Sequence, residues 1–197
     1  MTKWITALLI LALSPLAYGQ DSADPAAPAR HVPRAFLFQA GSWDVNIIAG
    51  AYEESFGGND EIIAFAGLDI EYFILDGLAL FAEPLGYYIE QGDPDAAAIG
   101  LNLGARWYFW QPTDTFAVYA EGGLGIIEAE HRVPSPHGTH HNFVEQLGIG
   151  AKLRLGNNFA LMGGVRYQHL SNASIHGSER NPGLDAFGGY GGLSIAF

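Results

Sequence analysis

A regular alternation of side chains along the chain is the feature that most restricts its fold. From Ile99 to Trp110, odd positions are apolar, while even positions are mainly glycine or polar residues. Because successive side chains of a β-strand point to opposite faces, a period of two predicts a strand with two chemically different faces. The same alternation recurs after residue 35, and no stretch there gives a convincing amphipathic helix.

Eight segments carry this alternation, and the connections between them alternate in length. We expect strands over 42–53, 61–74, 78–90, 96–110, 115–128, 142–155, 159–171 and 185–197. Short turns are expected at 75–77, 111–114 and 156–158, and longer polar loops at 54–60, 91–95, 129–141 and 172–184. This plan predicts an all-β fold over residues 35–197: an eight-stranded antiparallel transmembrane β-barrel of the outer-membrane type. Because the number of strands is even, the first strand should begin and the last strand should end on the periplasmic side.

The two faces of the strands indicate which side meets lipid. The charged strand residues share the less apolar parity; they are Asp44, Asp69, Glu71, Arg106, Glu121, Lys152 and Arg166. The opposite parity is bulky and apolar, as in Leu147, Ile149 and Leu153. We therefore expect lipid outside and a narrow polar lumen with paired charges. A soluble lipocalin-like barrel, the alternative, reverses these faces. Segment 78–90 is ambiguous, because Glu83 shares its parity with apolar neighbours.

The two ends of the chain indicate export. Lys3 precedes an apolar run over residues 4–13, and small residues follow at 17 and 19, a pattern typical of a signal peptide over residues 1–19. Ten apolar residues are too few to cross a bilayer as a helix. Residues 20–34 are rich in Pro and Ala and are predicted to be a flexible lead-in. The pattern Tyr190-x-Gly192-x-x-Ile195-x-Phe197 resembles the C-terminal assembly signal of bacterial outer-membrane barrels.

Composition excludes several classes of function. The chain has no cysteine, so it has neither disulfides nor thiolate ligands for zinc or iron–sulfur clusters. Its formal charge of −12 makes nucleic acid a poor partner. No nucleotide-binding glycine motif is present, and we expect no cofactor. His137, His140 and His141 lie in one loop, where solvated histidines are more common than a metal site, so no metal is expected.

His169 and Ser171 stand out on the expected seventh strand. Arg166 and Gln168 mark the even positions as lumenal, so both residues point toward lipid near the loop end. Residues two apart share a face, with Cα atoms roughly 6.5–7 Å apart, which suits a base and a nucleophile. Polar residues at the headgroup level of an ordinary barrel would give the same pattern.

The segment containing this pair resembles the lipid A 3-O-deacylase (PagL) family. The family carries a His-x-Ser-Asn motif late in an eight-stranded outer-membrane barrel, followed by an acid in the next strand and a terminal Phe; here the motif is His169-Leu170-Ser171-Asn172. The resemblance implies that Ser171 is the nucleophile and His169 its base. It also implies that Asn172 helps to hold the oxyanion, although alternation points its side chain inward.

The acid of such a triad has two candidates. The family residue is commonly Glu, whereas Asp185 follows the Asn181-Pro182-Gly183 string here, and Glu179 lies in the preceding loop. We favour Asp185, because its parity is lipid-facing and a triad needs a rigidly held acid.

The resemblance implies an outer-membrane serine ester hydrolase acting on lipid A or lipopolysaccharide, within the bilayer, at the 3-O position. A phospholipase or general lipid esterase with the same chemistry is one alternative. A structural or adhesive barrel without catalysis is another.

Overall fold

The computed structural model describes residues 38–55, 61–92, 94–175 and 177–197. The expected signal peptide at 1–19 and lead-in at 20–34 lie outside the described residues. The strands are β1 (Trp43–Glu54), β2 (Ile62–Leu75), β3 (Leu78–Glu90), β4 (Ala96–Thr113), β5 (Phe116–Val133), β6 (Thr139–Arg154), β7 (Phe159–Ser171) and β8 (Leu184–Ala196). A short 3₁₀ helix, η2 (Ser178–Arg180), lies between β7 and β8.

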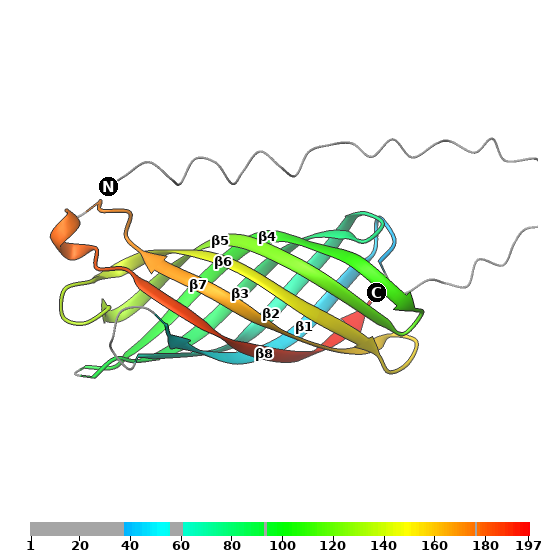
Figure 1. Cartoon of the computed structure of the whole chain (residues 1–197), viewed down its shortest axis with the longest axis horizontal. Helices are drawn as coiled ribbons and strands as arrows, with labels where there is room; N and C mark the ends of the chain where they lie inside the picture. The colour runs from blue at the N-terminus through cyan, green and yellow to red at the C-terminus, as the bar shows by residue number, and fades with distance from the viewer. Residues whose placement is uncertain (1–37, 56–60, 93, 176) are drawn as a thin grey trace, which may run out of the picture. The chain divides into compact units, whose positions relative to one another are not determined.

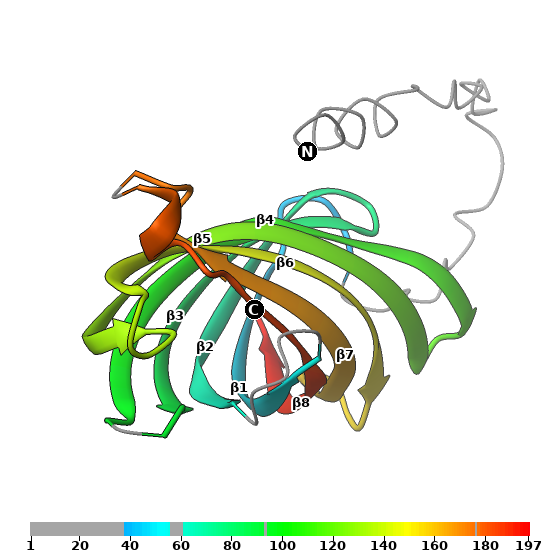
Figure 2. The ribbon, with the colours of Figure 1, turned by 60° about the vertical axis from the view of Figure 1, so that its left-hand side comes forward.

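The strands close into one antiparallel barrel in chain order, with β1 paired to β8 (Figures 1 and 2). This confirms the predicted fold class. All eight expected strands are present, and most of their ends lie within a few residues of the predicted bounds. The hairpin of β5 and β6 is longer than predicted, because pairing continues past a register shift to Val133 and Thr139. The C-terminus lies at the end opposite η2 (Figure 1), and there the Phe197 N–H donates to the Trp43 carbonyl.

The lumen is polar and its charges are paired, as the parity of the strands predicted. Among the described residues, three fully buried cations lie inside the barrel. Their partners are Asp69, Glu71, Glu83 and Glu121 for Arg106, Glu83 and Glu121 for Arg166, and Asp44 and Glu71 for Lys152. Burying a charge is costly unless it is paired, so these ion pairs make a charged interior compatible with a closed barrel.

Segment 78–90, which the sequence left ambiguous, turns its odd positions inward. Phe81, Glu83 and Leu85 are all buried, and Glu83 receives hydrogen bonds from Arg166. Acid and apolar residues share this parity because the lumen holds both a charged cluster and aromatic rings. Trp110 departs from the expected parity in the other direction: the register shifts between Trp107 and Trp110, and Trp110 is exposed.

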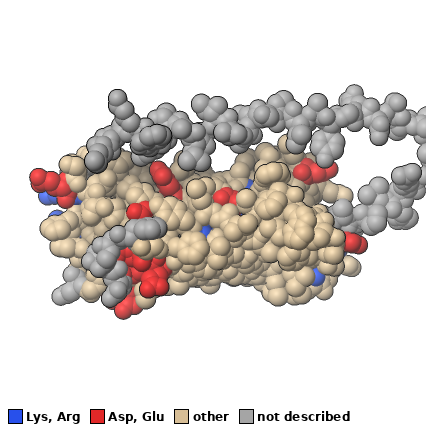
Figure 3. All heavy atoms as spheres, viewed as in Figure 1, with Lys and Arg blue, Asp and Glu red and all other residues tan. Residues whose placement is uncertain are grey.

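The outer surface is apolar around the barrel. Leu147, Ile149 and Leu153 are all strongly exposed, with 61% of Leu147 accessible. Exposed aromatic residues gather near the short turns; they include Trp43, Tyr72, Trp107, Trp110 and Phe159. An apolar belt with an aromatic girdle is the surface of a barrel in a bilayer, so the soluble alternative is wrong. In Figure 3 the largest acidic patch lies toward the end that carries η2, and the middle of the barrel is mostly uncharged.

Candidate active site

The last two strands bring the predicted base and acid together. His169 on β7 is directly opposite Asp185 on β8, and Nδ1 of His169 lies 2.7 Å from Oδ1 of Asp185. Both side chains are about one-third exposed, at 30% and 34%, on the outward side of the loop end. With Nδ1 engaged by the carboxylate, Nε2 is the nitrogen free to take a proton.

Asp185 is anchored by two further contacts. The Tyr167 hydroxyl donates to the same Oδ1 atom that His169 meets. The Asp185 carbonyl accepts a hydrogen bond from the Ser55 N–H at 2.8 Å, which ties β8 to the end of β1. The sequence did not predict the hydrogen bond from Tyr167 to Asp185, although the parity of Tyr167 places it on the same face as His169.

Glu179, the competing acid, lies in η2 and is exposed. Its side chain forms no hydrogen bond or ion pair with any residue that the structure describes. The structure thus brings Asp185, and not Glu179, to the imidazole.

Ser171 ends β7 on the same face as His169, and its side chain is half-buried. Its direct partner on the neighbouring strand β6 is Phe143. Within the described part of the chain the Ser171 hydroxyl has no hydrogen-bond partner, so it is not bonded to the imidazole in this conformation. Nucleophile–base hydrogen bonds are often long without substrate and tighten when it binds.

Asn172 points inward, as alternation predicted, and both of its donors are engaged. Its N–H donates to Oδ1 of Asn181 at 2.7 Å, and its side-chain amide donates to the Thr139 hydroxyl and the Arg180 carbonyl. An oxyanion role for Asn172 stays a prediction and requires Asn181 to release the N–H. Through these hydrogen bonds, Asn172 connects β6 to the loop after β7.

The loop between β7 and β8 is shaped to fit the imidazole. Ala173 and Ser174 adopt left-handed backbone angles, which turn the chain away just after the motif. Gly183 has a φ of +72°, and a Cβ there would lie 3.3 Å from Cε1 of His169. In the Asn-Pro-Gly string, the Asn181 side-chain oxygen therefore accepts a hydrogen bond from the Asn172 N–H. Gly183, which has no side chain, leaves room for the histidine ring.

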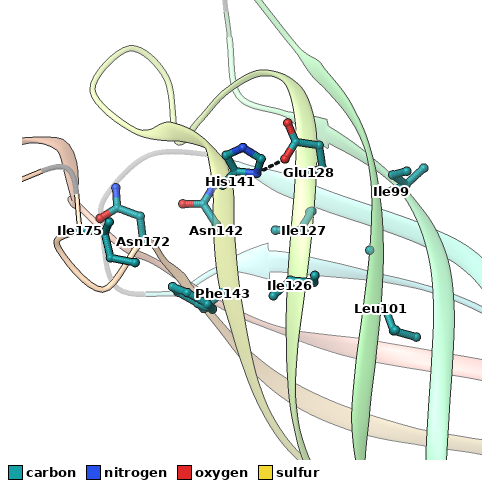
Figure 4. Close-up of a pocket in the computed structure, with 11 residues that line it drawn as sticks. Ile99, Leu101, Ile126, Ile127, Glu128, His141, Asn142, Phe143, Asn172 and Ile175 are labelled. Atoms are coloured by element: carbon teal, nitrogen blue, oxygen red, sulfur yellow. Dashed lines mark ion pairs between the residues drawn. The ribbon is translucent and has the colours of Figure 1, made fainter.

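An apolar groove of about 480 Å³ is lined by Asn172, the residue after Ser171, and by side chains of the neighbouring strands (Figure 4). Its walls include Ile99, Ile126 and Phe143 from β4, β5 and β6, and Ile175 from the loop after β7. Phe143 is the cross-strand neighbour of Ser171, so the groove begins one strand away from the serine. Ile99, Ile126 and Phe143 are all exposed on the lipid-facing side of the barrel.

No helix among the described residues is long and apolar enough to cross a membrane. No group of three His, Asp or Glu residues among them is arranged to hold a metal ion, and this includes His137, His140 and His141.

Comparison with known proteins decides the family. The model of the family described as lipid A 3-O-deacylase (PagL) matches residues 65–194, about two-thirds of the chain. The chain belongs to the lipid A 3-O-deacylase family. The match includes His169, Ser171 and Asp185 within its span. No curated protein sequence is similar enough to count as a match.

Solved structures share the fold. The outer membrane enzyme PagL superimposes with a TM-score of 0.57 at 19% identity, over 77% of this chain and 98% of that one. Neisserial surface protein A gives 0.60 at 14% identity, over 80% and 98%. The N-terminal β-barrel domain of OprF from Pseudomonas aeruginosa gives 0.52 at 20% identity, over 80% and 98%. These likenesses establish an outer-membrane barrel fold, and the family adds the expectation of a hydrolase.

Proposed function

We propose that this barrel is an outer-membrane serine ester hydrolase that removes one ester-linked acyl chain from lipid A, at the 3-O position that the family name specifies. The observation that carries the proposal is the 2.7 Å contact between His169 and Asp185 on the outward face, two residues from Ser171. A structural barrel has no use for a paired imidazole and carboxylate at that place.

The chemistry follows from the roles of the three residues. Ser171 Oγ attacks the ester carbonyl carbon, and its proton passes to Nε2 of His169. The carbon–oxygen bond to the sugar then breaks, and the imidazolium returns the proton to the leaving hydroxyl. Water, deprotonated by the same imidazole, then attacks the acyl carbon. The bond from that carbon to Ser171 Oγ breaks, the imidazolium returns the proton to Oγ, and the fatty acid is released. Asp185 holds the imidazole and stabilises its charged form in both halves.

The surroundings of the site suit a membrane lipid. An acyl chain of the outer leaflet can enter the apolar groove by lateral movement, without leaving the bilayer. Phe143, which lines the groove opposite Ser171, would then set the reacting ester near the strand end. This supports a lipid ester, and not a soluble ester, as the substrate.

The test is mass spectrometry of lipid A after incubation with the refolded barrel, beside Ser171→Ala. We expect the wild type, and not the variant, to remove one hydroxyacyl chain, with both proteins folded by heat-modifiable gel mobility. Cleavage of phospholipid in place of lipid A would transfer the proposal to a phospholipase. No cleavage of either lipid would favour a structural barrel.

Export by a cleaved signal peptide over residues 1–19 also belongs to this proposal. The intact mass of the chain recovered from outer membranes should correspond to a protein that begins at Gln20. A chain that retains Met1 would contradict the cleavage.

A further inference from the structure

A second, polar pocket of about 490 Å³ lies next to the apolar groove. It is lined by the end of β5, the start of β6 and η2, through Glu128, Arg132, Thr139, His140, His141 and Arg180. The proposed hydrolysis does not use it.

The distribution of cations in the barrel makes this pocket unusual. The described residues contain six Lys and Arg, of which three are buried in the lumen. Arg154 lies at the opposite end, where it binds the carbonyls of the β6–β7 turn. The remaining two, Arg132 and Arg180, both line this pocket. In a chain of net charge −12, every loop-end arginine that the structure describes thus lies at one place.

The arginines of the pocket are available for a ligand. Both side chains are exposed, and within the described ranges neither guanidinium has a hydrogen-bond or ion-pair partner. Glu128, the single acid among the lining residues, is already paired with His141 (Figure 4). Two unpaired guanidinium groups at one pocket suit a phosphate, which arginine binds through paired N–H groups.

The pocket is fixed relative to the candidate nucleophile. Glu128 and His141 line both the polar pocket and the apolar groove. Asn172, the residue after Ser171, lines the groove, and its amide binds Thr139 and the Arg180 carbonyl, both of the polar pocket. The Arg132 carbonyl is held by Gln91 at 2.8 Å. A lipid with its acyl chain in the groove would thus have its headgroup at the arginines.

We propose that this pocket binds a phosphate monoester on the sugar headgroup of the substrate and thereby selects a phosphorylated glycolipid. The inference rests on the proposed function for the identity of the lipid. A phosphate is the shared chemistry of a lipid headgroup and of free inorganic phosphate, so the test separates the two.

The test measures binding to a Ser171→Ala barrel, which keeps the lipid intact. Lipid A and the same lipid A treated with phosphatase are titrated in detergent micelles. Phosphorylated lipid A should bind more tightly, and Arg132→Gln or Arg180→Gln should each weaken its binding by about tenfold, since each variant removes a hydrogen bond to a charged group. The arginine variants should erase the preference for the phosphorylated lipid, and Arg180→Lys should retain part of it.

Arg154→Gln is the matched control, since it removes the same charge at the other end of the barrel and should leave the preference unchanged. Equal binding of both lipids, or no effect of either arginine, overturns the proposal. A third outcome also overturns the proposal: the arginine variants weaken the binding of inorganic phosphate but do not change the binding of lipid A. The pocket would then be a site for a free anion.

Failure of the two proposals is distinguishable. If lipid A binds through the arginines but the wild type does not cleave it, the hydrolase proposal fails and the pocket stands. If the wild type cleaves lipid A and the phosphate preference is absent, the pocket proposal fails alone.

Discussion

Replacing Asp185 by Asn is the perturbation that most sharply tests the proposed triad. The amide is nearly the same size as the carboxylate, so the strand pairing between His169 and Asp185 should persist. What changes is charge: the imidazolium that forms during the reaction would no longer face an anion, and the amide can stabilise the wrong tautomer of the ring.

The size of the effect follows from the contact. Unit charges about 4 Å apart attract by about 4 kcal/mol at an effective dielectric constant of about 20. The side chains of His169 and Asp185 are 30% and 34% exposed, so solvent screening lowers the attraction between the imidazolium and the carboxylate. A loss of about 2–3 kcal/mol remains after that discount. At about 1.4 kcal/mol for each factor of ten, kcat should fall by about 30- to 150-fold.

The assay compares initial rates of fatty-acid release by wild type, Asp185→Asn and Glu179→Gln in the same micelles. Glu179→Gln is the matched control, because it removes the same charge from the competing acid and should leave the rate within about twofold, as is usual for an exposed group far from a reacting centre. A large loss with Glu179→Gln and none with Asp185→Asn would refute the reasoning and reassign the acid.

Three further predictions concern the support of the site and the barrel. Tyr167→Phe removes one hydrogen bond to the active-site carboxylate and should lower kcat by about tenfold; an unchanged rate would make the tyrosine a packing residue. Arg166→Met leaves two buried carboxylates without that partner and should lower the free energy of unfolding in urea by about 3 kcal/mol or more; unaltered unfolding would contradict the paired lumen. Gly183→Ala should lower activity more than Gly177→Ala, since both glycines have positive φ but only the former lies against the imidazole; equal losses would point to backbone strain alone.

The fold was largely predictable because a membrane barrel repeats one pattern. Each strand must show apolar side chains to lipid, so alternation and turn residues were enough to count and place the strands. Local exceptions arose where another interaction dominated. Glu83 shares its parity with Phe81 because both face the lumen, and Trp110 turns outward at a register shift. The mixed parity around Glu83 was visible in the sequence, but its inward direction and the register shift at Trp110 were not.

The candidate site was predictable only in part. The closeness of His169 and Asp185 followed from antiparallel neighbours across one loop. The contacts of Asn172 depend on how that loop folds, with Ala173 and Ser174 in left-handed conformations, which no strand pattern encodes. The presence of Arg132 and Arg180 at one pocket likewise depends on the approach of η2 to the end of β5.

The central claim is that Ser171 is an activated nucleophile on the lipid-facing surface, and covalent trapping tests it most directly. The folded barrel in micelles is treated with a serine-reactive alkyl phosphonate, and the modified residue is identified by peptide mass spectrometry. We predict an adduct on Ser171 that forms far more slowly in His169→Ala. A folded barrel with no adduct on Ser171, or with labelling equal to that of the exposed loop residue Ser174, would contradict the account.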